Sequence, residues 1–298
     1  VSICLLKKVV ADVDLGQVQP YQPEHEPDSG KKVAIVGAGP AGLTAAWYLA
    51  GQGHAVTLYD EHDKPGGALQ YQVPEDRLPR DILQNEIDVI LKSGIELKSG
   101  VKVFDDIAIK EMQQTFDAMV LALGKTDVET LQKLGFETTK SGISVDSGSF
   151  MTSKTGIFAC GALVSGGKLA VKSVGQGKKT AFAVDLFLRA QDTIRGKRFQ
   201  SRMGRLQDGE SEEFIKEASR QERIHPRNDT FQSDEAQKEA ARCFHCDCRK
   251  PESSRLRLYS DEYGADQKRF QLSRRLPFQR VVQHADVVYE PGKCIRCG

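Results

Sequence analysis

The residues best suited to chemistry form a glycine-rich turn, Gly37-Ala38-Gly39-Pro40-Ala41-Gly42. Glycine at its first, third and sixth positions permits a tight turn, a close approach of the backbone to a pyrophosphate, and close packing of the next helix on the preceding strand. N–H groups and the positive end of the helix dipole would face the phosphates. Asp60 lies 18 positions after Gly42, where a carboxylate can accept hydrogen bonds from ribose hydroxyls and would repel a 2′-phosphate. Together these residues predict a dinucleotide site.

Cysteines form the second candidate site. The chain has seven, an odd number with close C-x-x-C spacings, which favours metal ligation over a disulfide framework and indicates a reducing, cytoplasmic compartment. Three thiolates within six residues can share one iron–sulfur cube, although zinc or an empty site are alternatives. The expected metal ligands are Cys243, Cys246, Cys248, Cys294 and Cys297. Cys160 is expected to be a small buried residue of a strand, and not a redox thiol.

The elements that must position the glycine turn follow from the hydrophobic pattern. Residues 33–36 and 55–59 are short apolar runs typical of buried strands, and residues 43–49 between them predict an alanine-rich helix. Residues 81–93 carry apolar side chains on one helical face. This alternation predicts an α/β fold with a parallel sheet.

Further motifs carry a resemblance to a known family. After the turn and its acid come KPGGAL at residues 64–69 and PEDRLP at residues 74–79, then AMVLALG at residues 118–124 and a strand and helix at residues 155–184. This combination resembles the FAD domain of the glutamate synthase small subunit family, which also includes the flavin part of dihydropyrimidine dehydrogenase and related iron–sulfur flavoproteins. The resemblance covers nearly the whole chain and implies a Rossmann-like, three-layer FAD-binding domain.

The family's cofactor contacts can be carried over to matching positions. The resemblance implies that the FAD pyrophosphate lies on the glycine turn, the adenosine ribose on Asp60 and the adenine on the backbone of Val103. The resemblance also implies further cofactor-binding residues, which lie near the flavin or in the later strands and helix of the FAD domain. They are Gly66, Gly67, Leu69, Arg77, Gly124, Gly161, Ala162, Leu169, Ala170 and Val171. A helix N-terminus near Leu169 would stabilise an anionic reduced flavin. No residue is expected to act as a catalytic acid, base or nucleophile.

Two departures from the family pattern change the expected function. Only 37 positions separate Gly124 from Gly161, without a second glycine fingerprint. A nucleotide-binding domain needs roughly 100 residues, so the family's inserted NAD(P)H domain cannot fit, and a partner protein is expected to exchange electrons with the flavin. Ala162 stands where the family has an acid that holds the ribityl chain. The loss of one such hydrogen bond costs about 0.5–1.5 kcal/mol and weakens FAD binding without preventing it.

The cysteine-bearing tail also differs from its relatives. Ser254 stands where relatives have a fourth cysteine, so a 4Fe-4S cluster would need a donor from Cys4, Cys294, Cys297 or another subunit. Residues 290–298 resemble the opening of a ferredoxin-type motif, interrupted after two cysteines.

Composition and charge bound the remaining possibilities. The 298 residues carry a net charge of +1 and include no apolar run long enough to span a bilayer. Residues 241–298 have 12 basic and 7 acidic side chains but no aromatic interleaving, which favours an acidic redox partner over nucleic acid. The chain begins with Val1 and ends within a motif, which suggests a central piece of a longer protein.

Four regions are expected along the chain. Residues 1–30 would be a helical remnant and linker, 31–190 the FAD-binding domain, 191–232 a polar helical linker and 233–298 an iron–sulfur-like tail. The sequence thus predicts an electron-transfer flavoprotein that relays electrons to or from iron–sulfur centres. Two alternatives stay open: an NAD(P)H-dependent oxidoreductase whose nucleotide site lies on another chain, and a non-catalytic adaptor with a degenerate flavin site.

Overall fold

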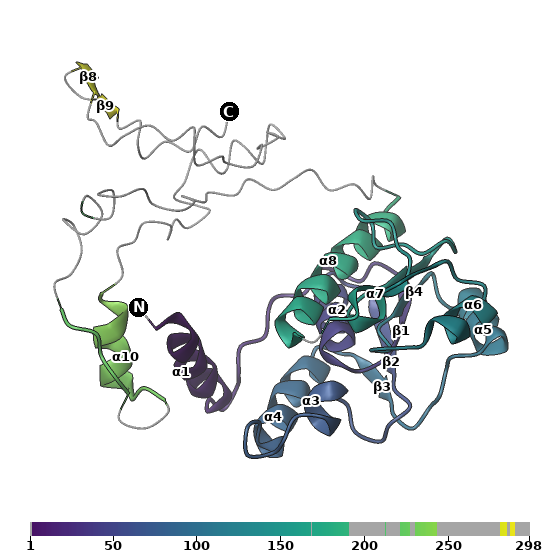
Figure 1. Cartoon of the computed structure of the whole chain (residues 1–298), viewed down its shortest axis with the longest axis horizontal. Coiled ribbons are helices and arrows are strands. Elements are labelled where there is room, and N and C mark those ends of the chain that lie inside the picture. Colours follow the sequence, from purple (N-terminus) through teal and green to yellow (C-terminus); the bar gives the residue numbers. More distant parts are fainter. Residues whose placement is uncertain are drawn as a thin grey trace. The chain divides into compact units, whose positions relative to one another are not determined.

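The computed structural model describes residues 2–167, 169–190, 212, 221–226, 230–242, 281–284 and 287–289 (Figure 1). The chain divides into two compact units. One unit consists of Val18–Arg195, and the other combines Val1–Gln17 with Gly196–Gly298. The five cysteines predicted to hold metal all lie outside the described residues.

A five-stranded parallel sheet forms the centre of the first unit. Its order is β3-β2-β1-β4-β7, and β1 therefore has a strand on either side. Val33 of β1 pairs with Val56 of β2 and with Ala118 of β4. The strands are β1 (Lys32–Val36), β2 (Ala55–Tyr59), β3 (Glu96–Lys98), β4 (Ala118–Leu121) and β7 (Ile157–Ala159).

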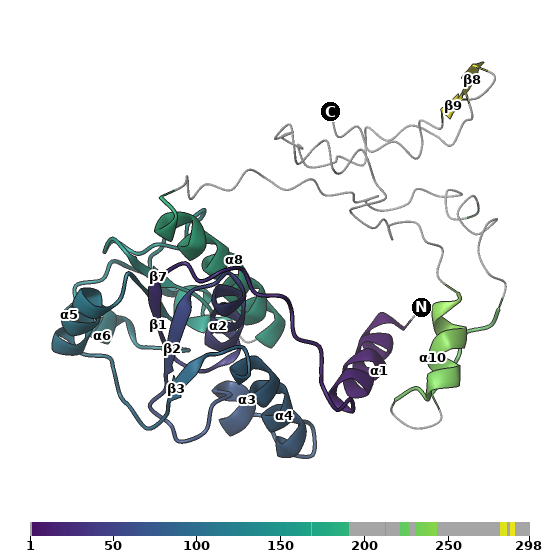
Figure 2. The same cartoon turned by 180° about the vertical axis from the view of Figure 1, so that it is seen from behind.

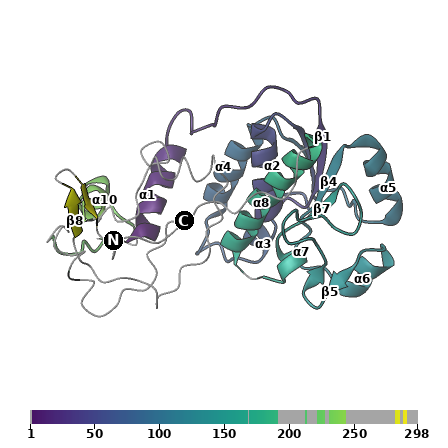
Figure 3. The ribbon, with the colours of Figure 1, turned by 90° about the horizontal axis from the view of Figure 1, so that it is seen from above.

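Helices cover both faces of this sheet (Figures 2 and 3). One face carries α2 (Pro40–Gly51), α4 (Arg80–Leu91) and α8 (Ala170–Leu188), and the other carries α5 (Asp106–Thr115) and α6 (Val128–Lys133). Because alternate strand residues point to opposite faces, Val33 and Ile35 belong to one core, and Ala34 and Val36 belong to the other. The predicted α/β fold with a parallel sheet is confirmed.

The connection between β4 and β7 is short. It contains α6 and a hairpin of β5 (Thr138–Thr139) and β6 (Gly142–Ile143), and Met151 then forms an antiparallel bridge to Phe158. Strand β7 pairs directly with β4. Residues 124–161 are all described and contain no βαβ unit.

The other unit contains α1 (Ile3–Leu15), α10 (Ser233–Ala240) and an antiparallel pair, β8 (Val281–His284) and β9 (Val287–Tyr289). The buried carboxylate of Glu239 joins the first two elements. It accepts hydrogen bonds from Ser2 N–H at 2.9 Å, Ile224 N–H at 3.0 Å and Arg242 at 2.8 Å. Burial alone would raise the pKa of Glu239, but Arg242 and the two amides outweigh it and lower the pKa to about 2.

None of the helices in the described ranges is long and apolar enough to cross a membrane.

Candidate dinucleotide-binding site

The glycine turn joins β1 to α2, and two of its glycines are required by the backbone itself. Gly37 has φ +106°, and a Cβ there would lie 2.5 Å from the carbonyl oxygen of Ala122. A Cβ on Gly42 would lie 1.8 Å from the carbonyl oxygen of Gly37. Side chains at these positions would collide with backbone, so the first and sixth glycines fix the turn against β4.

Gly39 is different, because its missing side chain leaves open space. Its φ of −80° suits any residue, and a Cβ there would approach only Gly67, at 3.8 Å. The loop that carries Gly67 lies against the turn: Gly66 N–H donates to the carbonyl oxygen of Ala38 at 2.8 Å. The turn and this loop therefore form a cradle of bare backbone, which suits the close approach of a phosphate.

The start of α2 supplies donors for an anion. Pro40 occupies the first helical position and has no N–H, and Leu43 N–H already donates to the carbonyl oxygen of Gly39 at 2.9 Å. The amides of Ala41 and Gly42 lie between them, at the positions where a helix has no carbonyl one turn earlier. These amides and the helix dipole favour negative charge at this end.

Asp60 is held against the turn. It is 7% exposed, and its Oδ2 accepts a hydrogen bond from Ala38 N–H at 2.6 Å. Its Oδ1 accepts from His62 N–H at 2.9 Å and lies 3.0 Å from His62 Nδ1. The half-exposed His62 ring stacks on Tyr71 with 4.6 Å between centroids. Sequence reasoning did not identify a role for this ring, because the contact depends on the conformation of the loop after β2.

Arg80 holds the loop between Gly67 and α4, which contains the short helix α3 (Ala68–Tyr71), and sequence reasoning did not identify it. Its guanidinium donates to the carbonyl oxygens of Leu69 and Leu78, each at 3.1 Å, and to that of Val73. The available signal was an arginine at the first position of a helix, where the dipole disfavours positive charge. The predicted residue Arg77 is exposed on the same loop.

The segment from β7 to α8 contacts the start of α2 at two further glycines. A Cβ on Gly161 (φ +77°) would lie 2.9 Å from the Cβ of Ala41, and one on Gly177 would lie 2.3 Å from the carbonyl oxygen of Ala41. Helix α8 therefore packs on the first turn of α2. Leu169 and Val171, at the start of α8, are exposed, and Ala162 begins the short helix α7 (Ala162–Ser165) beside Gly161.

The last two predicted residues, Val103 and Gly124, lie on the segments that follow β3 and β4. The side chain of Val103 is 7% exposed and belongs to the core on the α5 face, where it also lines a groove of about 630 Å³ between α5 and the sheet. Gly124 (φ +78°) follows β4 with no protein atom near its missing Cβ. The structure does not bring Val103 to the glycine turn through its side chain.

Cys160 is fully buried at the end of β7. Desolvation raises the pKa of its thiol to about 12, so the group is a neutral thiol at physiological pH. A buried protonated thiol is a poor nucleophile, in agreement with the expected structural role.

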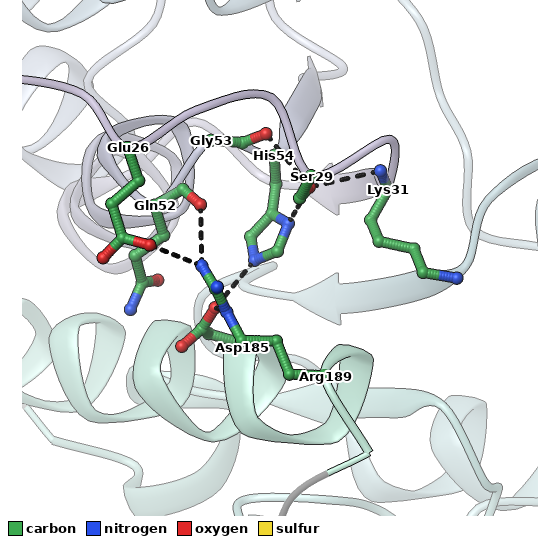
Figure 4. Close-up of polar contacts among 8 residues, drawn as sticks. All are labelled: Glu26, Ser29, Lys31, Gln52, Gly53, His54, Asp185 and Arg189. Atoms are coloured by element: carbon green, nitrogen blue, oxygen red, sulfur yellow. Dashed lines mark hydrogen bonds and ion pairs between the residues drawn. The ribbon is translucent and has the colours of Figure 1, made fainter.

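A polar network ties the segment before β1 to the end of α8 (Figure 4). His54 Nδ1 lies 2.7 Å from Ser29 Oγ, and His54 Nε2 lies 3.1 Å from Asp185 Oδ1. Arg189 donates to Asp185 at 2.5 Å and to Glu26 at 2.6 Å. Burial lowers the pKa of His54, although Asp185 acts in the opposite direction. Serine, histidine and aspartate also form hydrolase triads, but the His54 side chain is 0% exposed and cannot serve a substrate, so the network is structural.

The parallel sheet with helices on both faces and the glycine turn after β1 define a Rossmann-like α/β fold. The family of pyridine nucleotide-disulphide oxidoreductases matches residues 7–177, and the chain belongs to this family.

Individual relatives support the predicted resemblance. The chain is 35% identical over 185 residues to the NADPH-Fe(3+) oxidoreductase subunit beta of Geobacter sulfurreducens, which covers 58% of this chain and 27% of the relative. It is 42% identical over 113 residues to the glutamate synthase [NADPH] small chain of Mycobacterium tuberculosis, and this match covers 38% of this chain and 23% of the relative. It is 46% identical over 96 residues to the NADP(+)-dependent formate dehydrogenase subunit beta of Moorella thermoacetica, and this match covers 32% of this chain and 14% of the relative. The resemblance to glutamate synthase small chains is confirmed, and the matched region spans 27% or less of each relative.

Proposed function

We propose that the chain binds one FAD non-covalently at the glycine turn and carries electrons between this flavin and a redox partner protein. The observation that supports this most is the bare backbone cradle of Gly39 and Gly67 beside the buried carboxylate of Asp60. The pyrophosphate would lie on the turn, with the amides of Ala41 and Gly42 as donors. Asp60 would accept a hydrogen bond from the adenosine ribose.

FAD supplies the redox chemistry, and the residues of this chain bind and orient it. The amides at the start of α8, near Leu169, Ala170 and Val171, would stabilise negative charge on the reduced ring system. Gly66, Leu69 and Arg77 would line the flavin side of the loop that Arg80 holds. Ala162 cannot accept a hydrogen bond from the ribityl chain, so we expect weaker FAD binding than in a relative with an acid there.

We propose a protein partner as the electron source because of the short connection between β4 and β7. Its content, α6 and one hairpin, is far smaller than a nicotinamide-binding domain. Two of the relatives above are named as beta subunits of NADPH- or NADP(+)-dependent enzymes. The second candidate function is therefore that of an NAD(P)H-dependent oxidoreductase whose nucleotide site lies on another chain of an assembly.

The metal proposal rests on spacing alone. Cys243, Cys246 and Cys248, with Cys294 and Cys297, are the expected ligands of one or more 4Fe-4S clusters. Such clusters would pass electrons to or from the flavin. The same cysteines support our expectation of a reducing, cytoplasmic compartment.

Rapid mixing of the FAD-loaded chain with NADPH under anaerobic conditions tests this function. We expect the flavin absorbance to stay constant with NADPH alone and to bleach with dithionite. Rapid, stoichiometric bleaching by NADPH would contradict the need for a partner. A protein that neither contains nor takes up flavin would instead favour the adaptor without redox activity.

A further inference from the structure

The carboxylate of Asp60 has little capacity left for a ligand. A carboxylate offers about four lone-pair positions. Three of them are occupied: Ala38 N–H uses Oδ2, and His62 uses Oδ1 through both its backbone N–H and its ring Nδ1. One acceptor position, on Oδ2, remains.

A ribose offers two adjacent hydroxyl donors, and the acid in this position of a dinucleotide fold accepts from them. We propose that the His62 ring competes with the ribose for Asp60 and must release Oδ1 when both hydroxyls bind. This inference rests on the proposed dinucleotide binding. His62 would then be a specificity-determining residue. It would set how much more tightly the site binds a nucleotide with both ribose hydroxyls than one with a single hydroxyl.

The surroundings of His62 allow the ring to move while its backbone stays. The carbonyl oxygen of His62 accepts a hydrogen bond from Gly100 N–H at 3.1 Å, and its own N–H donates to Asp60. The side chain is 49% exposed and packs on the ring of Tyr71. Tyr71 is itself fixed, because its hydroxyl donates to the carbonyl oxygen of Lys64 at 3.1 Å and accepts from Lys64 N–H at 3.3 Å. Rotation of His62 about its side-chain bonds therefore breaks one hydrogen bond and one stacking contact.

Calorimetric titration of the flavin-free chain with ADP and with 2′-deoxy-ADP tests the competition. In His62→Ala, ADP should bind about three- to tenfold more tightly than in the wild type, because no ring bond is broken. The affinity for 2′-deoxy-ADP should stay the same, since its single hydroxyl can use the free position on Oδ2. The gain should therefore depend on the second hydroxyl.

Two further variants keep the result interpretable. His62→Phe retains a ring to stack on Tyr71 but lacks the donor, so it should show the same gain for ADP. His25→Ala changes an exposed histidine before β1 and should change neither affinity. The fluorescence of Trp47, the single tryptophan, on α2, reports whether each variant keeps its fold.

Three outcomes would overturn the inference. Weaker ADP binding by both His62 variants would make His62 a ligand of the nucleotide and not a competitor. An equal gain for ADP and 2′-deoxy-ADP would show an effect unrelated to the diol. If neither nucleotide binds any variant, the proposed dinucleotide site itself fails, and this inference fails with it.

Discussion

The backbone amide of Ala38 donates a 2.6 Å hydrogen bond to the carboxylate of Asp60, 22 positions further along the chain. This bond joins the glycine turn after β1 to the residue that follows β2, so one contact holds together the residues that we propose for the pyrophosphate and the ribose. A dinucleotide that binds the turn meets an acid that is already oriented. Such preorganisation lowers the entropic cost of binding.

We predict that Arg80→Met loosens the loop between Gly67 and α4. The substitution leaves the carbonyl oxygens of Leu69, Val73 and Leu78 without the guanidinium. We expect a loss of about 1–2 kcal/mol in unfolding free energy, measured by Trp47 fluorescence in urea, and a lower FAD affinity. Arg77→Met, on the same loop but exposed, is the matched control and should keep the stability. Equal stability of the two variants would show that Arg80 does not support the loop.

His54 should make the α/β unit less stable in mild acid. Burial lowers its pKa, so the unfolded chain takes up a proton that the folded chain resists as the pH falls below about 6.5. Unfolding free energy should therefore fall with decreasing pH, with His54 contributing at most about 1.4 kcal/mol per pH unit. His54→Gln should reduce this slope between pH 7 and 5, whereas His25→Gln, which changes an exposed histidine, should keep it. An unchanged slope in His54→Gln would mean that the histidine is not held neutral.

Cys160 should resist thiol reagents in the folded protein. Its raised pKa and complete burial leave almost no accessible thiolate at pH 8, whereas Cys4 is exposed. Brief alkylation followed by mass spectrometry should label Cys4 and spare Cys160, and unfolding in urea should make both reactive. Labelling of Cys160 at the rate of Cys4 in the native protein would contradict its placement in the core.

Glu239 should control the packing of α1 against α10. Because its pKa falls from an ordinary 4.5 to about 2, the ionised carboxylate contributes stability above pH 4.5 that is lost as the pH falls toward 2. Glu239→Gln imitates the protonated form at pH 7 and should speed hydrogen exchange in α1. Glu222→Gln, an exposed control, should not change that rate. If α1 exchanges equally slowly in both variants, another contact holds the helix.

Sequence reasoning located the parts of the site that local spacing determines. Glycine positions and apolar runs predicted the turn, β1 and β2 because their geometry depends on neighbouring residues. His62, Arg80 and Glu239 were missed, because their partners depend on loop shape or lie far away in the chain; Ser2, for example, is 237 positions from Glu239.

Helix α10 shows the same limit at its first residue. The run Ser233-Asp234-Glu235 predicts an N-cap at Ser233, but the N-cap is Gln232, whose N–H donates to Glu235 at 3.0 Å. With this bond, the helix begins one residue closer to the N-terminus than the sequence pattern predicts. The cysteine ligands and most of the helical linker predicted over residues 191–232 lie outside the described residues and stay predictions.

The most direct test of the account is the FAD content of Gly39→Ala. A methyl group at Gly39 meets no protein atom closer than 3.8 Å and needs no unusual backbone angle, so the fold should survive while the pyrophosphate loses its place. Gly51→Ala, at the end of α2 with open space around it, is the control. After saturation with FAD and gel filtration, we predict about one FAD per chain for the wild type and Gly51→Ala. Gly39→Ala should retain almost none, and equal retention by all three proteins would contradict a flavin site at this turn.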